Sequence, residues 1–117
     1  MLSSRLTREE APFNVVELRR YQRAVVDVAV EFSSPGSNVR TSGKAKDISV
    51  GGMYIETAHP AAFNTQVIVH MAVDGQRTPL HLPATVRWVR ASEGMGLQFG
   101  LLGARETHAI TELTRTP

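Results

Sequence analysis

Residues 24–32 read AVVDVAVEF, and this stretch decides the fold class. Every second residue from 26 to 32 is valine or phenylalanine, while Asp27, Ala29 and Glu31 occupy the positions between them. A period of two is typical of a β-strand with one face buried and the other exposed to water. The stretch therefore predicts a strand that packs against a core on one side.

The same period recurs along the rest of the chain. Breaks rich in glycine, proline or small polar residues separate the runs, as at 33–38 and at Asp74-Gly75. Further strands are predicted at 40–49, 53–57, 67–73, 78–90 and 94–100. In the fifth of the six strands, one predicted face holds Leu80, Leu82, Ala84, Val86 and Trp88. Pro83 cannot donate to a ladder, so we expect a sheet edge or a bulge there.

Six short strands separated by regular turns predict an all-β domain, either a small antiparallel barrel or a sandwich. After the last strand, Ala109, Ile110 and Leu113 stand at helical spacing within residues 104–114. This spacing predicts one short C-terminal helix. Such a helix is too short to be stable alone, so we expect it to dock on the barrel.

Composition limits the class of protein. With 117 residues, 42% hydrophobic and 21% charged, the chain suits one domain, which we expect at 18–117 after a flexible N-terminal arm at 1–17. The absence of cysteine excludes disulfides, thiolate metal sites and cysteine nucleophiles. No apolar run approaches the roughly 20 residues of a membrane helix, and the N-terminus lacks the apolar stretch of a secretion signal. We therefore expect a cytoplasmic protein without membrane insertion.

The positive charge is confined to one end of the chain. Residues 1–23 hold five arginines against three glutamates, which accounts for the whole net charge of +2, because the remainder holds eight basic and eight acidic residues. A protein that grips long nucleic acid would spread its basic residues over a face of the fold. A local arginine cluster is better suited to a small, multiply charged anion, since guanidinium groups can make paired hydrogen bonds to it.

Two groups of polar residues flank the first strand. Arg19 and Arg23 stand four apart just before it, with Arg20 between them, and a D-x-S-x-x-G sequence runs from Asp47 to Gly52 at the junction of the second and third strands. If these strands are neighbours of the first, both groups meet at one rim of the barrel. Arginine forks can pair with phosphate oxygens or with the O6 and N7 acceptors of guanine.

The D-x-S-x-x-G sequence has the complementary chemistry. Asp47 can accept hydrogen bonds from guanine N–H groups, and Ser49 can donate one to a phosphate or a base. Gly51 and Gly52 permit close approach of the backbone. A carboxylate repels phosphate, so its place beside the arginines indicates that a base is recognised as well.

These features resemble the PilZ domain, a family of bacterial receptors for the second messenger cyclic di-GMP. The family's RxxxR segment is similar to residues 19–23, and its [DN]-x-S-x-x-G motif is similar to residues 47–52. The runs VRWV at 86–89 and GMGLQF at 94–99 resemble the family's late strands. The resemblance covers residues 18–113. It implies a six-stranded antiparallel barrel of the split-barrel type, with an arginine loop that folds over the ligand.

The resemblance also implies which residues bind cyclic di-GMP. These are Arg19, Arg20, Arg23, Asp47, Ser49, Gly51 and Gly52. Leu18 precedes the first motif arginine where a third arginine could stack on a second ligand, so one cyclic di-GMP per chain is expected. The function expected is that of an adaptor without an output domain, which relays the signal to an unidentified protein effector in motility, pilus, surface or biofilm regulation. No catalysis and no cofactor are expected.

Two other functions stay open at this point. One is a module of the same fold that binds a protein partner, for example in motility or pilus machinery, without needing cyclic di-GMP; intact motif residues argue against it. The other is a small nucleic-acid-binding barrel, which the balanced charge beyond residue 23 disfavours. Tyr21 could stack on a base, whereas Trp88 is in phase with Leu82 and Val86 and is expected to pack in the core or at the rim.

The four histidines do not predict a metal site. If Gly75 and Gln76 form a two-residue hairpin loop, His70 faces His81 across the ladder. No third ligand is evident, and the polar outer face of a hairpin explains both residues. Ser49 has no recognisable base partner, and no spacing suggests paired catalytic carboxylates or a Walker loop, so an enzyme is not expected.

Overall fold

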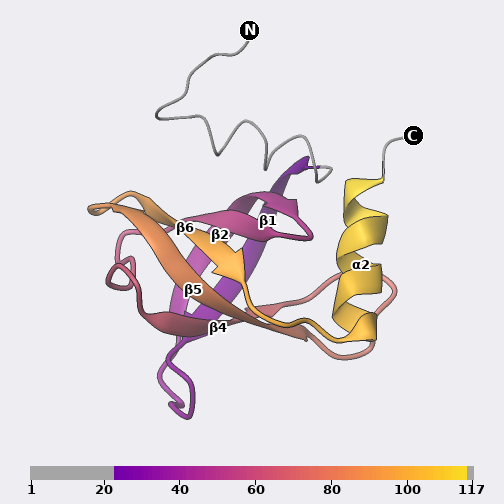
Figure 1. Cartoon of the computed structure of the whole chain (residues 1–117), viewed down its shortest axis with the longest axis horizontal. Helices are drawn as coiled ribbons and strands as arrows, with labels where there is room; N and C mark the ends of the chain where they lie inside the picture. The colour runs from indigo at the N-terminus through magenta and orange to yellow at the C-terminus, as the bar shows by residue number, and fades with distance from the viewer. Residues whose placement is uncertain (1–22, 116–117) are drawn as a thin grey trace, which may run out of the picture.

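The computed structural model describes residues 23–115, which form a six-stranded barrel with one helix (Figure 1). In chain order the elements are β1 (Ala24–Ser33), β2 (Thr41–Ser49), β3 (Gly52–Glu56), β4 (Gln66–Met71), β5 (Leu80–Arg90), β6 (Gly94–Phe99) and α2 (Ala104–Thr114). The strands pair antiparallel in the closed order β1-β2-β3-β6-β5-β4. The predicted all-β barrel and the C-terminal helix are confirmed. The predicted arm at 1–17 lies outside the described residues.

Alternate residues of the strands fill the barrel interior. In β1, Val30 and Phe32 are buried, while Asp27 and Glu31 face water, as the period of two predicts. Other strands contribute side chains that are fully enclosed, among them Ile55. Burying a side chain of this size stabilises the fold by about 1.5–3 kcal/mol, so the closed interior is the main source of stability.

The pairing of β1 with β2 determines where the site forms. The register runs from Ala24 opposite Ile48 to Phe32 opposite Thr41. The start of β1 therefore lies beside the end of β2. Two segments 24 residues apart in sequence are thus neighbours at one rim of the barrel, as the sequence argument required.

A β-bulge in β2 determines which way Asp47 faces. Ala45 pairs with Ile55 of β3, but Asp47 pairs with Tyr54, so Lys46 is an extra residue on β2. Ala45 and Ile48 are both fully buried although they are three positions apart. The extra residue therefore shifts the alternation by one and places Asp47 on the outer surface.

A second bulge, in β5, turns Trp88 to the face opposite to the one predicted. Val86 pairs with Leu97 of β6 and Trp88 pairs with Gly96, so Arg87 is the extra residue. Leu80, Leu82, Ala84 and Val86 are buried as predicted, but Trp88 is 46% exposed. The expectation that Trp88 shares their face was wrong, because simple alternation cannot anticipate a bulge.

The expectation of an edge or a bulge at Pro83 was also wrong. Pro83 lies opposite Ile68 of β4, and its carbonyl oxygen accepts a hydrogen bond from the backbone N–H of Gly100 at 2.8 Å. The strand is therefore flanked on both sides at this point. The bulge of β5 falls further along, between Val86 and Trp88.

Helix α2 docks on the barrel as predicted. Ala109 and Ile110 are buried in the core. At the first turn, the Arg105 guanidinium donates hydrogen bonds to the side chain of Gln76 at 2.9 Å and to the carbonyl oxygen of Thr78 at 2.6 Å. Figure 1 shows α2 beside the connection between β4 and β5 to which these two residues belong. Within residues 23–115, no helix is long and apolar enough to cross a membrane.

The β4–β5 connection is longer than a tight hairpin. β4 ends at Met71 rather than at the predicted Val73, and β5 begins at Leu80, so residues 72–79 connect them. Gly75 adopts a φ of 85° within the predicted turn, a conformation that glycine accepts without strain.

Candidate ligand-binding site

Arg23 and Asp47 meet on the outer surface at the rim where β1 begins and β2 ends. Nη2 of Arg23 donates a hydrogen bond to Oδ1 of Asp47 at 2.5 Å. Each side chain remains 36% exposed, so both are accessible to a ligand. The arginine segment and the D-x-S-x-x-G sequence are thus brought together by the contact between Arg23 and Asp47. Arg19 and Arg20 lie outside the described residues.

Asp47 belongs to a row of outward-facing residues that crosses four neighbouring strands. Asp47 of β2 lies opposite Tyr54 of β3, Tyr54 lies opposite Gly96 of β6, and Gly96 lies opposite Trp88 of β5. We call these four residues the outer row. Because adjacent strands are about 4.8 Å apart, the row extends the polar corner at Asp47 into an aromatic surface.

The two aromatic rings of the outer row stack on each other. The rings of Tyr54 and Trp88 have centroids 5.3 Å apart and an interplanar angle of 13°. Gly96 makes this possible, because a Cβ atom there would collide with the indole of Trp88. The guanidinium carbon of Arg90 lies 5.7 Å from the centroid of a Trp88 ring, within the range of a cation–π interaction.

The remaining motif residues organise the turn between β2 and β3. Ser49 is 1% exposed, and its Oγ accepts a hydrogen bond from the backbone N–H of Gly51 at 3.1 Å. The carbonyl oxygen of Gly51 accepts one from the N–H of Phe99 at 3.0 Å. Any Cβ at Gly52 would collide with the backbone carbonyl of Leu97. In the described chain Ser49 and Gly52 therefore hold the corner in shape, and Ser49 is not an exposed donor.

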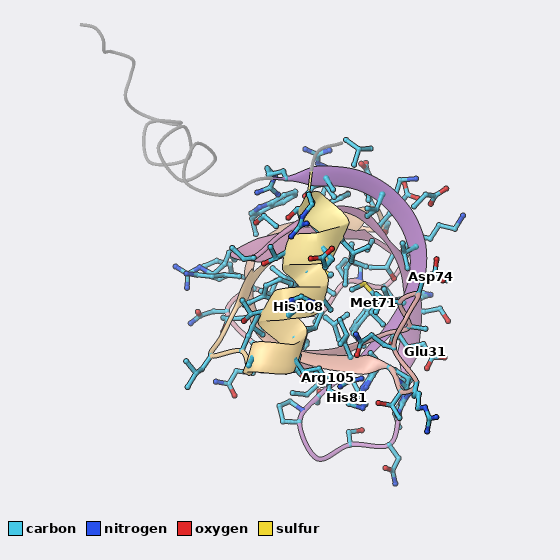
Figure 2. All side chains as sticks on the ribbon, turned by 90° about the vertical axis from the view of Figure 1, so that its right-hand side faces the viewer. Glu31, Met71, Asp74, His81, Arg105 and His108 are labelled. Carbon is cyan, nitrogen blue, oxygen red and sulfur yellow. The ribbon has the colours of Figure 1, made fainter. Side chains whose placement is uncertain are left out.

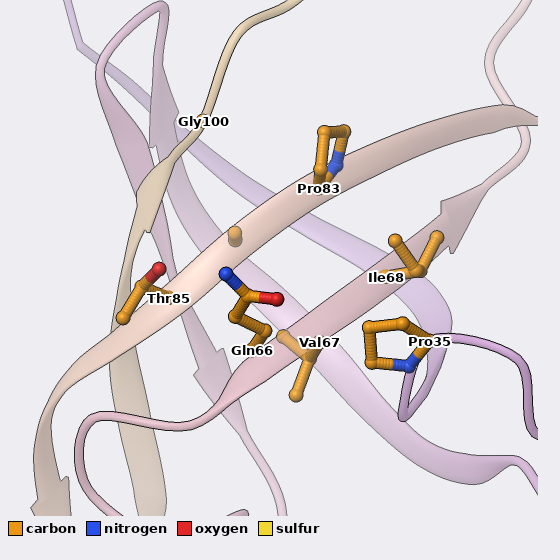
Figure 3. A pocket seen from close by; sticks show the side chains of 8 residues that line it. Pro35, Gln66, Val67, Ile68, Pro83, Thr85 and Gly100 are labelled. Carbon is orange, nitrogen blue, oxygen red and sulfur yellow. The ribbon is translucent and has the colours of Figure 1, made fainter.

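Two hollows lie elsewhere on the surface of the described barrel. One of about 120 Å³ lies over β4 and β5, between Pro35, Ile68 and Pro83 (Figure 3). Another of about 200 Å³ is lined by residues that include Phe32, Val39 and His59. Neither hollow is lined by Arg23 or by a member of the outer row. Among the described residues, Arg23 and the outer row offer a ligand charge pairing and stacking.

The chemistry of this surface suits a ligand that has both an anionic group and a flat ring. Arg23 offers planar donors, Asp47 offers paired acceptors, and the Tyr54–Trp88 stack offers an aromatic surface. Tyr54, Trp88 and Arg90 of this candidate surface were not among the binding residues predicted from the sequence. Gly96 could have indicated them, because a glycine leaves room for a large side chain from a neighbouring strand. To identify that side chain as Trp88, however, the register of β5 and β6 must be known.

Comparison with known proteins identifies the family. The family model for the PilZ domain matches residues 17–115. The chain belongs to the PilZ domain family. The resemblance proposed from the two motifs and the late strands is therefore confirmed. A comparison with curated protein sequences gives no significant match.

Solved PilZ structures have the same fold. The PilZ domain of YcgR from Escherichia coli with cyclic di-GMP superposes with a TM-score of 0.65 at 17% identity, covering 83% of this chain and 88% of that one. The PilZ domain of CeSA from a cellulose-synthesizing bacterium gives 0.63 at 21% identity, covering 79% and 93%. PlzA of Borreliella burgdorferi in complex with cyclic di-GMP gives 0.64 at 13% identity, covering 97% of this PilZ chain and 51% of PlzA.

Proposed function

We propose that this PilZ protein is a receptor for cyclic di-GMP. The observation that carries the proposal is the meeting of Arg23 and Asp47, one from each motif, at a single exposed rim. Two of the similar structures, those of YcgR and PlzA, contain cyclic di-GMP, which supports the same ligand here. The ligand combines two guanines with two phosphodiesters and therefore requires both acceptors and cationic donors.

Binding begins with an exchange of partners at the rim. In the described chain the Arg23 guanidinium and the Asp47 carboxylate form an ion pair with each other. The guanine N–H donors take the place of the guanidinium on Asp47, and the released Arg23 pairs with a phosphate or with guanine O6 and N7. The exposed ion pair contributes only about 0–1 kcal/mol, whereas hydrogen bonds to charged groups contribute about 1.5–3 kcal/mol each. The exchange is therefore favourable once a guanine is in place.

The other motif residues have two kinds of role in this proposal. Arg19 and Arg20, from the arginine segment, complete the cationic side of the ligand. Ser49, Gly51 and Gly52 form the opposite corner, where the turn must keep its shape for Asp47 to face the guanine. Ser49 donates to the ligand only if the turn opens, because its side chain is buried.

The outer row supplies the surface for a base. Trp88 is nearly half exposed and is stacked on Tyr54, on the same row as Asp47. A guanine held by Asp47 can extend over this pair, and stacking of a base on an aromatic side chain is worth about 1–3 kcal/mol.

The output of the receptor is a change in what its surface binds. We infer that the arginine segment folds over the ligand and that a protein effector recognises the altered rim. The protein acts in this account as an adaptor in motility, pilus, surface or biofilm regulation. No catalytic step is assigned to it.

Calorimetric titration of the full chain with cyclic di-GMP tests the proposal, with GMP and a short oligonucleotide as ligand controls. Arg23→Ala and Asp47→Asn should each weaken binding by at least about tenfold, as expected for a lost charge-assisted bond. The matched control is Arg40→Ala, because Arg40 forms a similar exposed ion pair with Glu31 at 3.2 Å on the far part of β1. That variant should bind as the wild type does.

Each alternative has its own outcome. Absence of heat with every ligand would favour the protein-interaction module that does not need cyclic di-GMP. Binding of the oligonucleotide with similar affinity would favour the nucleic-acid-binding barrel. Unchanged affinity for cyclic di-GMP in both rim variants would place the ligand elsewhere.

A further inference from the structure

His70 and His81 form a close pair on the outside of the barrel, away from the residues of the candidate ligand site. His70 of β4 lies opposite His81 of β5 in the ladder, and their Nδ1 atoms are 2.9 Å apart. The ring centroids are 5.0 Å apart with the planes at 78°. Figure 2 shows His81 on the same side of the molecule as Glu31 and Arg105. The pair faces across the ladder although the connection is longer than the two-residue loop that the sequence argument required.

A buried hydroxyl orients the first of these rings. Nε2 of His70 lies 3.0 Å from Oγ of Ser33, and Ser33 is 6% exposed. If Nε2 carries the proton and donates it to Ser33, Nδ1 of His70 holds a free lone pair that points toward His81. Metal-binding histidines typically have this arrangement, with the other ring nitrogen donating to an oxygen of the protein.

We propose that His70 and His81 chelate one divalent transition-metal ion through their Nδ1 atoms, copper(II) or nickel(II) in preference to zinc. Two nitrogens bound at about 2.0–2.1 Å with an angle of 90° are about 2.9 Å apart. The tetrahedral angle that zinc adopts requires about 3.3 Å instead. Square-planar and tetragonal nitrogen–oxygen sites are typical of copper(II) and nickel(II). The Nδ1–Nδ1 separation in the metal-free, hydrogen-bonded pair is 2.9 Å, so the two rings can bind an ion in the first geometry without moving apart.

The other coordination positions belong to water. Within residues 23–115, no three histidine, aspartate or glutamate side chains cluster closely enough to hold a metal. Glu31 lies opposite His70 in the ladder, but its carboxylate is paired with Arg40. The site is therefore a two-histidine chelate, open to solvent on the side of His81.

The proton balance of binding is simple. Without metal, one Nδ1 must carry a proton for the two to form a hydrogen bond, and His81 is that donor when His70 donates to Ser33. The metal replaces this proton, which moves through solvent to the exposed Nε2 of His81. Two neutral imidazoles thus bind the ion with no net release of protons.

A metal ion bound to His70 and His81 would stabilise the pairing of β4 with β5. The ion would bridge β4 and β5 close to the start of the connection at 72–79, whose Gln76 and Thr78 hold Arg105 of α2. A ligand that binds only the folded state stabilises it by mass action. This inference does not depend on cyclic di-GMP binding.

The test is calorimetric titration of chelator-treated, tag-free full chain with copper(II), and then with nickel(II) and zinc(II). We expect one copper ion per chain and a rise in melting temperature with added copper. His70→Gln and His81→Gln should each lower copper affinity by at least about tenfold, and Ser33→Ala should lower it less, since Ser33 only orients a ligand. The matched controls are His59→Gln and His108→Gln, two exposed histidines outside the pair.

Two results would overturn the proposal. One is copper affinity that is unchanged in both His70→Gln and His81→Gln, which would assign the metal to other groups of the chain. The other is an equal loss in the control variants. Paramagnetic broadening of the His81 ring protons in the NMR spectrum, with those of His108 unaffected, gives a second readout that does not require either variant to fold.

Discussion

The indole of Trp88 lies over Gly96 in the adjacent strand and stacks on Tyr54 in the strand beyond. Gly96→Ala should displace the indole, because a Cβ at this position would collide with it. We expect a loss of about 1–3 kcal/mol of unfolding free energy, as for other overpacked sites, together with a changed fluorescence spectrum. Trp88 is the single tryptophan of the chain, so tryptophan fluorescence reports on the surroundings of this one side chain.

Gly100→Ala is the control for that substitution. A Cβ at Gly100 would lie 3.7 Å from the Pro83 carbonyl oxygen, which is an ordinary van der Waals contact. Its spectrum should match that of the wild type. An unchanged spectrum for Gly96→Ala as well would mean that the tryptophan does not lie over the glycine.

Arg23→Ala should leave the fold nearly as stable as before. The ion pair with Asp47 is exposed, and such pairs contribute at most about 1 kcal/mol. Urea unfolding of the variant and of Arg40→Ala should therefore give similar small changes. A loss of more than about 2 kcal/mol would show that Arg23 has a structural role, and weakened ligand binding in this variant would then no longer identify a contact.

Ser49→Ala should lower the free energy of unfolding, although it removes only one hydroxyl group. The hydroxyl of Ser49 accepts from the Gly51 N–H in a part-buried position. Removing it leaves that donor unpaired, at a cost of about 1–3 kcal/mol. Ser42→Ala is the control, since Ser42 is exposed on the same strand. Equal stability of the two variants by thermal unfolding would contradict the role assigned to this hydroxyl.

Asp27 makes the free energy of unfolding depend on pH in the acidic range. The pKa of Asp27 is lowered from 3.8, chiefly by a hydrogen bond from Lys46 and also by the charge of Lys44. The folded state therefore holds the carboxylate ionised to lower pH than the unfolded state does. The stabilisation is complete above pH 3.8 and is lost as the pH falls through the lower, folded-state value.

Lys46→Met removes the main cause of that shift. The difference in unfolding free energy between wild type and variant should be small, because the groups are exposed, and it should shrink as the pH falls below 3.8. Denaturant unfolding between pH 3 and 6 measures it. A difference that grows toward low pH would have the wrong sign.

The sequence predicts the barrel well because its strands follow a simple rule. Val30 and Phe32 belong to a pattern of period two and face the core. Ile110 belongs to a pattern with helical spacing and is buried where α2 docks. Each side chain of this kind is placed by its immediate neighbours in sequence. The meeting of the two motif segments at one rim also followed from the adjacency of β1 and β2, but the outward orientation of Asp47 depends on the bulge at Lys46.

The aromatic half of the site could not be predicted in the same way. Lys46 and Arg87 are each an extra residue in a strand, and nothing in a single sequence marks a bulge. Alternation without a bulge puts Trp88 inside the barrel, and the bulge puts it outside. The stack of Trp88 on Tyr54 depends further on the register of β6 between them, which is a property of the closed barrel as a whole.

We propose that cyclic di-GMP binds where Arg23 and Asp47 meet and extends over the outer row. The most direct measurement is a titration of the full ¹⁵N-labelled chain with cyclic di-GMP, followed in ¹H–¹⁵N spectra. We predict saturable shifts of the Asp47 and Tyr54 amides and of the Trp88 indole N–H, with the amide of Ile68, on β4 outside the outer row, unchanged. Shifts confined to the hollow around Ile68 and Pro83, with those three signals unmoved at saturation, would contradict the account.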